Sequence, residues 1–180
     1  MKRTRITLVA LLTVAAACAQ TMEAPKPALE LNKLDMLVGS WTLQGDMKAT
    51  AACPAGKTVE NVKCDWMQGG FFLECRSQIK GPMGDAVALK VFGYSDDEKT
   101  FTWRNFDGVG EFQDSRGRVE GDTWVFSGDS KMLRTSTKGR YTIKVTSPTS
   151  YEYAFEISRD GKDWTRILDG KATKTRVPAF

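Results

Sequence analysis

The sequence predicts an all-β protein: a single antiparallel up-and-down β-barrel of about ten strands with a short N-terminal helix. After residue 39, apolar and polar residues alternate with a period of two, which is the period of a half-buried strand. Turn sequences rich in glycine, aspartate and proline separate these segments at short, regular spacing. Sequential antiparallel strands with one apolar face remove their open edges by closing into a barrel, and a two-sheet sandwich is the alternative.

The chain begins with an export signal and a tether. A positively charged start, an apolar run and three alanines form the three parts of a signal peptide over residues 1–17. Cys18 follows directly, which resembles a bacterial lipoprotein signal and makes Cys18 the expected lipidation site on the periplasmic face of the outer membrane. Cleavage after Ala19 by ordinary signal peptidase is the alternative, and it predicts a soluble periplasmic or secreted protein. Residues 18–28 contain two prolines and are expected to form the tether.

The charge of the chain argues against a nucleic-acid partner. The formal net charge is +4, and three of the basic residues (Lys2, Arg3 and Arg5) belong to the signal peptide, so that +4 − 3 leaves +1 on the mature chain. Such a balance is no electrostatic footprint for nucleic acid or anionic lipid. We therefore expect contact with a membrane through the lipid anchor only.

The expected domain spans residues 29–180. Residues 29–38 have leucines at helical spacing and end before Gly39, a residue suited to a helix C-terminus. Ten strands are expected after it, at residues 41–50, 58–68, 71–80, 86–94, 100–106, 110–120, 122–127, 133–146, 151–158 and 164–173.

The second and third strands should form a hairpin whose register the turn determines. Gly69–Gly70 suits a two-residue turn, because type I′ needs a positive φ at both positions. Pairing outward from that turn sets Trp66 opposite Leu73 and Cys64 opposite Cys75. In this register the apolar residues of both strands share one face, and a slip by one residue would destroy that sorting.

Three cysteines remain after Cys18, and in an oxidising compartment spare thiols usually pair. The register favours a disulfide between Cys64 and Cys75. Counting from a two-residue turn makes this a hydrogen-bonded, wider pair, which argues for strain. A bridge from Cys53 to either cysteine is therefore the rival.

The chain contains no histidine. This excludes Ser-His-Asp and Cys-His catalysis and every metal site with a histidine ligand. We expect no metal, no cofactor and no enzymatic activity. An enzyme would have to work with carboxylates, tyrosine or lysine alone. Asp107 and Glu111 are an example of an acid–base pair, and nothing in the sequence distinguishes that pair.

Four segments in this order and spacing resemble a bacterial lipocalin-like (calycin) family of unknown function, domain of unknown function 1579. They are residues 37–41 (LVGSW), 66–73 (WMQGGFFL), 92–95 (FGYS) and 160–164 (DGKDW). The resemblance covers residues 34–175. It implies that Gly39 and Trp41 lie at the barrel floor, with Trp41 under an arginine from a late strand, either Arg166 or Arg176. Nitrobindin-like haem barrels are more distant relatives, but their haem needs an axial histidine, so His-ligated haem is excluded here.

Aromatic residues of the later strands indicate the function that we expect, the binding of a small apolar molecule inside the barrel. The alternative for each ring is that it simply fills the interior. The candidate ligand-binding residues are Phe101, Trp103, Asn105, Trp124, Phe126, Tyr141, Tyr151, Tyr153 and Phe155.

A non-catalytic structural or interaction module of the cell envelope is the alternative function. Phe72, Phe106 and Val125 are expected on the outer face of the barrel, where an apolar patch would serve to dock another protein. The sequence identifies no particular protein partner.

Overall fold

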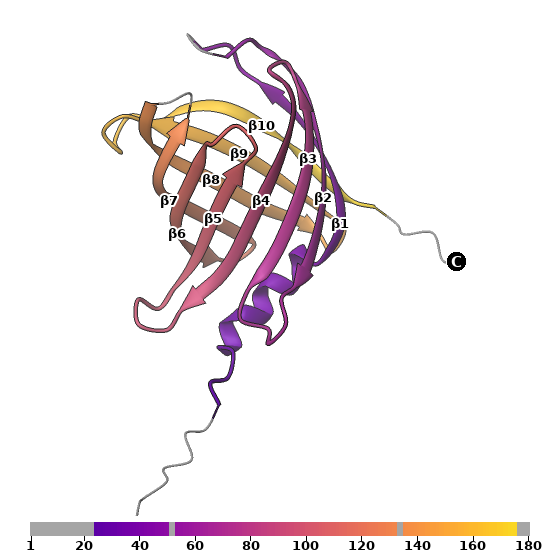
Figure 1. Cartoon of the computed structure of the whole chain (residues 1–180), viewed down its shortest axis with the longest axis vertical. Coiled ribbons are helices and arrows are strands. Elements are labelled where there is room, and N and C mark those ends of the chain that lie inside the picture. Colours follow the sequence, from indigo (N-terminus) through magenta and orange to yellow (C-terminus); the bar gives the residue numbers. More distant parts are fainter. Residues whose placement is uncertain (1–23, 51–52, 133–134, 176–180) are drawn as a thin grey trace, which may run out of the picture.

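The structure is a computed structural model that describes residues 24–50, 53–132 and 135–175. The expected signal peptide, Cys18 and the first part of the tether lie outside these residues. A 3₁₀ helix and ten strands form one closed barrel (Figure 1). The elements are η1 (Leu29–Leu37), β1 (Gly39–Met47), β2 (Gly56–Trp66), β3 (Leu73–Gly81), β4 (Gly84–Ser95), β5 (Thr100–Asp107), β6 (Phe112–Glu120), β7 (Thr123–Met132), β8 (Thr135–Ser147), β9 (Ser150–Ser158) and β10 (Thr165–Lys174).

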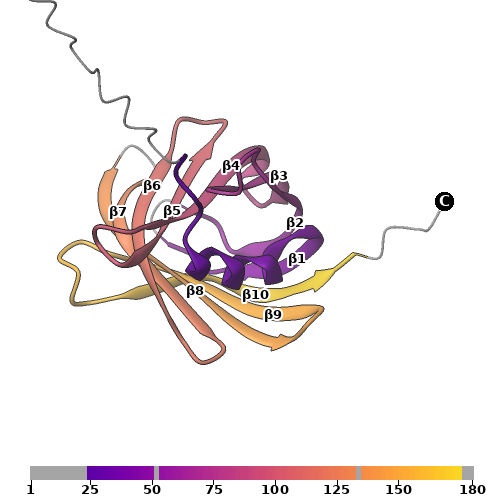
Figure 2. The same cartoon turned by 90° about the horizontal axis from the view of Figure 1, so that it is seen from below.

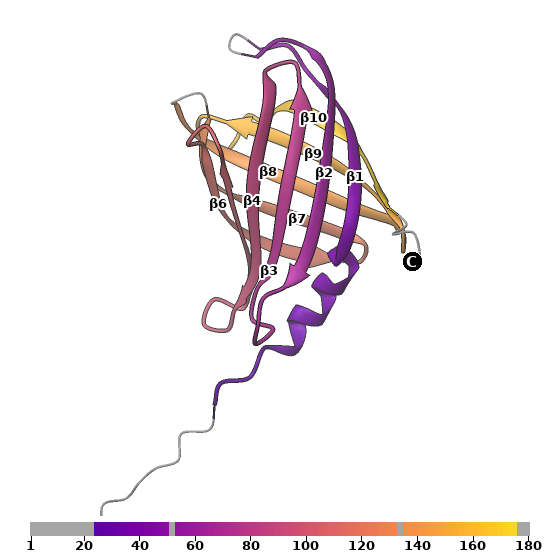
Figure 3. The same cartoon turned by 45° about the vertical axis from the view of Figure 1, so that its right-hand side comes forward.

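The strands follow one another around the barrel, each antiparallel to its neighbour in sequence. Closure comes from β1, in which Trp41 is paired with Val62 of β2 on one side and with Lys174 of β10 on the other. The up-and-down barrel is thereby confirmed and the two-sheet sandwich is ruled out. Figure 3 shows β1–β4 crossing in front of the inclined strands β7–β10.

Helix η1 lies across one end of the barrel (Figure 2). Its three leucines, Leu31, Leu34 and Leu37, recur every third residue and are all buried against the barrel interior. A 3₁₀ helix has three residues per turn, so this spacing aligns the leucines on one edge of η1. The helix ends at Leu37, Val38 is its C-cap, and Gly39, which has a φ of 108°, begins β1. Among the described residues, no helix is long and apolar enough to cross a bilayer.

The hairpin register is confirmed, with Trp66 opposite Leu73 and Cys64 opposite Cys75. The expected two-residue turn is wrong. The N–H of Met67 donates to the carbonyl of Phe72, so the strands end at Trp66 and Leu73 and the loop between them is longer. This hydrogen bond makes Met67 and Phe72 a hydrogen-bonded pair. The hydrogen-bonded and non-hydrogen-bonded pairs of the hairpin therefore exchange places relative to those expected from a two-residue turn.

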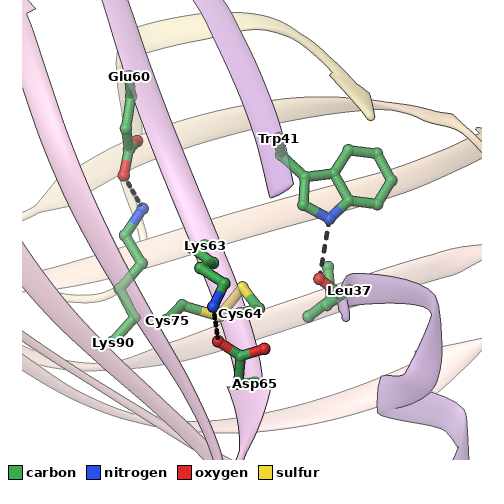
Figure 4. Close-up of a disulfide and its surroundings, with 8 residues drawn as sticks. All are labelled: Leu37, Trp41, Glu60, Lys63, Cys64, Asp65, Cys75 and Lys90. Carbon is green, nitrogen blue, oxygen red and sulfur yellow. Dashed lines mark hydrogen bonds and ion pairs between the residues drawn. A yellow bond between two sulfur atoms is a disulfide. The ribbon is translucent and has the colours of Figure 1, made fainter. Parts of the chain in front are cut away.

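The disulfide joins Cys64 to Cys75, and Cys53 is a buried free thiol, so a bridge from Cys53 is ruled out (Figure 4). The Cα atoms of Cys64 and Cys75 lie 4.0 Å apart, as in the closer, non-hydrogen-bonded pairs of an antiparallel ladder. The objection that this pair is a wide one was therefore wrong, because it assumed the two-residue turn.

The barrel interior near η1 is filled. Phe92, Phe101, Trp103, Trp124 and Phe126 lie in mutual ring contact, with centroid separations of 5.0–6.2 Å. Together with the leucines of η1 they form one buried cluster. Tilted and offset rings at such separations stabilise a core beyond the area that they bury. This half of the barrel is therefore a packed core.

Candidate ligand-binding site

A cavity of about 300 Å³ occupies the other half of the barrel, at the end opposite η1. Its lining includes the strand ends at Met47, Gly81 and Met132, which lie farthest from the helix. Apolar walls come from residues such as Ile79 and Phe155. A volume of this size is at the lower end of the range for small-molecule sites.

Glu60 and Lys90 form an ion pair within this cavity (Figure 4). Glu60 is on β2 and Lys90 on β4, and both side chains point inward because they share strand parity with the core residues Val62 and Phe92. The side chains are only 15% and 14% exposed. A pair of opposite charges taken so far out of water is maintained by mutual compensation, since either charge alone would be costly there.

A row of polar side chains continues from Lys90 across the neighbouring strands. The register pairs Lys90 with Asn105, Asn105 with Gln113, and Gln113 with Ser130. All four residues line the cavity. Gln113 donates from Nε2 to the hydroxyl of Ser115 at 2.8 Å. One wall of the cavity is therefore a band of hydrogen-bonding groups with a single lysine.

Two tyrosines, Tyr141 of β8 and Tyr153 of β9, also line the cavity. Burial raises the pKa of Tyr153 to about 12 and raises that of Tyr141 well above its ordinary value, with the nearby charge of Glu60 acting in the same direction. Both hydroxyls therefore stay neutral at physiological pH. Tyr153 has room to lie across the strands because Gly45 and Gly170 have no side chains. A Cβ atom added at Gly45 or Gly170 would lie only 2.4 or 2.8 Å, respectively, from the Tyr153 hydroxyl oxygen.

Two buried polar atoms on cavity-lining residues have no hydrogen-bond partner within the described part of the chain. They are the indole Nε1 of Trp103 and the Oδ1 of Asn105. A buried polar group without a partner costs about 1–3 kcal/mol. A polar ligand group that approached after a small shift of these side chains would recover part of that cost.

The sequence-predicted ligand residues divide between the two halves of the barrel. Five of them line the cavity: Trp103, Asn105, Tyr141, Tyr153 and Phe155. Four others, Phe101, Trp124, Phe126 and Tyr151, are buried in the packed half and are absent from the cavity lining. The sequence reasoning missed Glu60, Lys90, Gln113 and Ser130. The available signal for Glu60 was its parity with Val62 and Cys64 on the apolar face of the hairpin.

The expectation that Arg166 covers Trp41 is wrong. Arg166 is exposed, because a bulge between Arg166 and Leu168 leaves its side chain outside the barrel. Its Nη2 lies 3.4 Å from the Oε1 of Glu156. The cation over the Trp41 ring is Lys174, whose Nζ lies 5.2 Å from the ring centroid. Arg176 lies outside the described residues.

Trp41 itself is buried at the helix end of the barrel, next to Gly39. Its indole Nε1 donates to the carbonyl of Leu37 at 2.8 Å, which ties the first strand to η1 (Figure 4). Trp66 makes a second link, donating to the carboxylate of Asp35 at 2.8 Å. These tryptophans therefore hold the helix against the barrel end.

The carboxylate of Asp107 has a structural task. Its Oδ1 accepts the backbone N–H groups of Val109 and Glu111 at 3.0 and 2.8 Å, which fixes the turn between β5 and β6. Asp160 does the same in the last turn, between β9 and β10, where its carboxylate accepts from the amides of Lys162 and Asp163. Both residues organise loops of the chain.

The fold and the cavity together define the class of protein, which is a lipocalin-like barrel. It is a small closed antiparallel barrel with a helix across one end and a cavity at the other. The chain belongs to the family described as "Protein of unknown function (DUF1579)", whose model matches residues 26–174. The crystal structure of Rv2717c from M. tuberculosis is similar in fold, with a TM-score of 0.59 and 15% sequence identity over 84% of this chain and 100% of that chain. No curated protein matches the sequence.

Proposed function

We propose that this protein is an exported binding protein of the bacterial cell envelope, which holds one small, mainly apolar molecule in the cavity opposite η1. The single observation that supports binding is the cavity itself, about 300 Å³ in volume and bounded by apolar and aromatic walls with a few polar groups on one side. Ligand sites of proteins have this composition, because apolar walls provide affinity and a few polar groups orient the ligand.

Export and anchoring follow from the start of the sequence. A signal peptide over residues 1–17 directs the chain out of the cytoplasm, and acylation of Cys18 attaches it to the membrane. Two or three acyl chains provide stable attachment, because each buried CH₂ contributes about 0.8 kcal/mol. The Cys64–Cys75 disulfide is in keeping with an oxidising compartment.

Native mass spectrometry of the protein purified gently from its own cell envelope, without reductant, tests both parts. We expect a chain that starts at Cys18, bears acyl groups and releases one small molecule on activation. A bare chain starting at Gln20 would overturn the anchoring. An empty barrel would overturn the binding function.

A matched pair of variants links any co-purifying molecule to the cavity. Ala86→Phe places a ring in the cavity lining, whereas Val87→Phe places one on the outer face one residue later, where Val87 is 58% exposed. The first variant should lose the molecule and the second should retain it. Loss from both, or from neither, would contradict binding in this cavity.

The alternative function is a non-catalytic interaction module, and the outer face of β4 and β5 favours it. Val87 and Phe106 are 58% and 46% exposed and border a shallow groove that also includes Leu89. Phe72 is exposed as well, whereas Val125 is half-buried. An empty barrel combined with a Phe106→Ser variant that fails to co-purify with a partner of the wild-type protein would favour this function.

A further inference from the structure

We propose that the cavity selects a ligand with an uncharged hydrogen-bonding head group, such as an alcohol or an amide, and rejects the corresponding carboxylate, with Glu60 and Lys90 as the residues that set this specificity. This inference rests on the proposed binding function and names the class of ligand.

The ion pair determines what charge the interior accepts. Lys90 is the cation of the polar wall, and its ammonium group is already compensated by Glu60. A carboxylate that took Lys90 as its partner would leave Glu60 without one, in a place where its side chain is only 15% exposed. Removing one partner from a buried pair is strongly unfavourable. Among the described residues that line the cavity, an anionic ligand would therefore find an uncompensated positive charge only at the rim, at Lys131.

The rest of the polar wall is uncharged. Asn105, Gln113 and Ser130 provide donors and acceptors without net charge, and Tyr141 and Tyr153 remain neutral because burial raises the pKa of each hydroxyl. A neutral group that both donates and accepts hydrogen bonds matches such a surface. A charged group would lose its hydration with no counter-ion to replace it.

The rim of the cavity also disfavours anions. Its ionisable residues are three carboxylates, Asp85, Asp107 and Glu111, and one cation, Lys131. These groups border on water, so their effect is screened and weaker than that of the interior pair. Their balance is nonetheless negative, opposite to the charge that would guide a carboxylate inward.

The volume sets the size of suitable probes. At about 30 Å³ for each water-sized group, the cavity of about 300 Å³ has room for about ten such groups. Octan-1-ol, octanoate and octylammonium each have eight carbons, a suitable length, and differ in the head group. Octanoate has one methylene fewer in its apolar chain, which accounts for about fourfold in affinity, so a difference of tenfold or more reports the charge of the head group.

Isothermal titration calorimetry of the disulfide-bonded protein at neutral pH tests the inference. We expect octan-1-ol to bind most tightly and octanoate to bind at least about tenfold more weakly. Tighter binding of octanoate or of octylammonium than of octan-1-ol would overturn the inference and leave the proposed binding function standing. Absence of binding by all three probes, together with an empty barrel in native mass spectrometry, would overturn both.

Two variants test the assignment to the ion pair. Glu60→Gln keeps the size of the side chain and leaves Lys90 uncompensated, so the affinity for octanoate relative to octan-1-ol should rise by at least about tenfold. Lys90→Gln removes the cation, so this ratio should not rise and octylammonium should gain instead. Glu98→Gln is the matched control, because Glu98 pairs with Arg116 on the exposed surface, and it should change none of the ratios.

An unchanged octanoate-to-octanol ratio in folded Glu60→Gln protein would overturn the role of the pair. A rise of equal size in Glu98→Gln would do the same, because it would show that the ratio follows the overall charge of the protein. Circular dichroism establishes that each variant is folded, and the wild-type comparison of the three probes decides the ligand class even where a variant does not fold.

Discussion

The cross-strand disulfide should contribute measurably to the stability of the barrel. Cys64 and Cys75 are separated by 11 residues in sequence. For a loop of that length, the loss of chain entropy in the unfolded state corresponds to about 2.8 kcal/mol at room temperature. For a domain of this size, each kcal/mol shifts the melting temperature by about 2–4 °C, so reduction should lower it by about 6–11 °C.

The assay compares the oxidised wild-type protein with the same chain unfolded, reduced and refolded under reducing conditions, by urea denaturation and by thermal melting. Both forms contain the same sulfur atoms, so packing differs little and the difference reports the cross-link. Cys53→Ala is the control, and its oxidised and reduced forms should differ by the same amount as those of the wild type. Coincident midpoints for the two wild-type forms would refute the reasoning.

Three further substitutions test the packing and the electrostatics. Leu34→Ala empties a fully buried position at the helix end and should cost about 3 kcal/mol in urea denaturation; a cost under about 1 kcal/mol would mean that η1 does not seal the barrel. Gly45→Ala brings a methyl group within 2.4 Å of the Tyr153 hydroxyl and should cost about 1–3 kcal/mol, part of which Tyr153→Phe should restore in a double-mutant cycle. Burial opposes ionisation of Glu156, but the hydrogen bonds and charges of Arg140 and Arg166 together outweigh it and lower the pKa below 4.5. The ionised carboxylate therefore stabilises the fold above pH 4.5, and this contribution is lost as the pH falls through the lowered pKa. Replacing it in Glu156→Gln should make the free energy of unfolding depend less steeply on pH on the acid side. An unchanged pH dependence would contradict this.

The order of the elements was predictable because the signals for it are local. Each strand alternates over its own length, and each turn lies between two such segments. The pairing of Cys64 with Cys75 followed from one turn and one apolar face. The turn itself was predicted too tight, because Gly69 and Gly70 both have the positive φ expected of them but belong to a longer loop.

The site was only half predictable, because alternation says which face a side chain occupies and not how far along the barrel axis it lies. Trp103 and Trp124 both point inward, yet only Trp103 lines the cavity. The position along the axis depends on the tilt and stagger of all ten strands together, which no single segment specifies.

β4 shows a second limit of the pattern. Its most apolar row, Val87, Leu89 and Val91, lies on the outer face, and Ala88, Lys90 and Phe92 face inward. A lysine among inward residues is understandable only once Glu60 lies opposite it, and that residue comes from β2, 30 positions earlier. A buried charge is thus a tertiary property, decided by its partner and invisible in the alternation of its own strand.

The four segments that resemble the family and the residues that line the cavity are different sets. None of the residues in the segments 37–41, 66–73, 92–95 and 160–164 is in the cavity lining. Their roles are structural: Trp41 holds the helix against the barrel, and Asp160 organises a turn. Gly93 leaves room for the ring of Phe72, which would lie 2.8 Å from a Cβ atom added at Gly93. These four segments therefore describe the scaffold and carry no information about the cavity in the open half of the barrel. The class of ligand has to be inferred from that half, where the Glu60–Lys90 pair is the feature that a ligand's charge would meet.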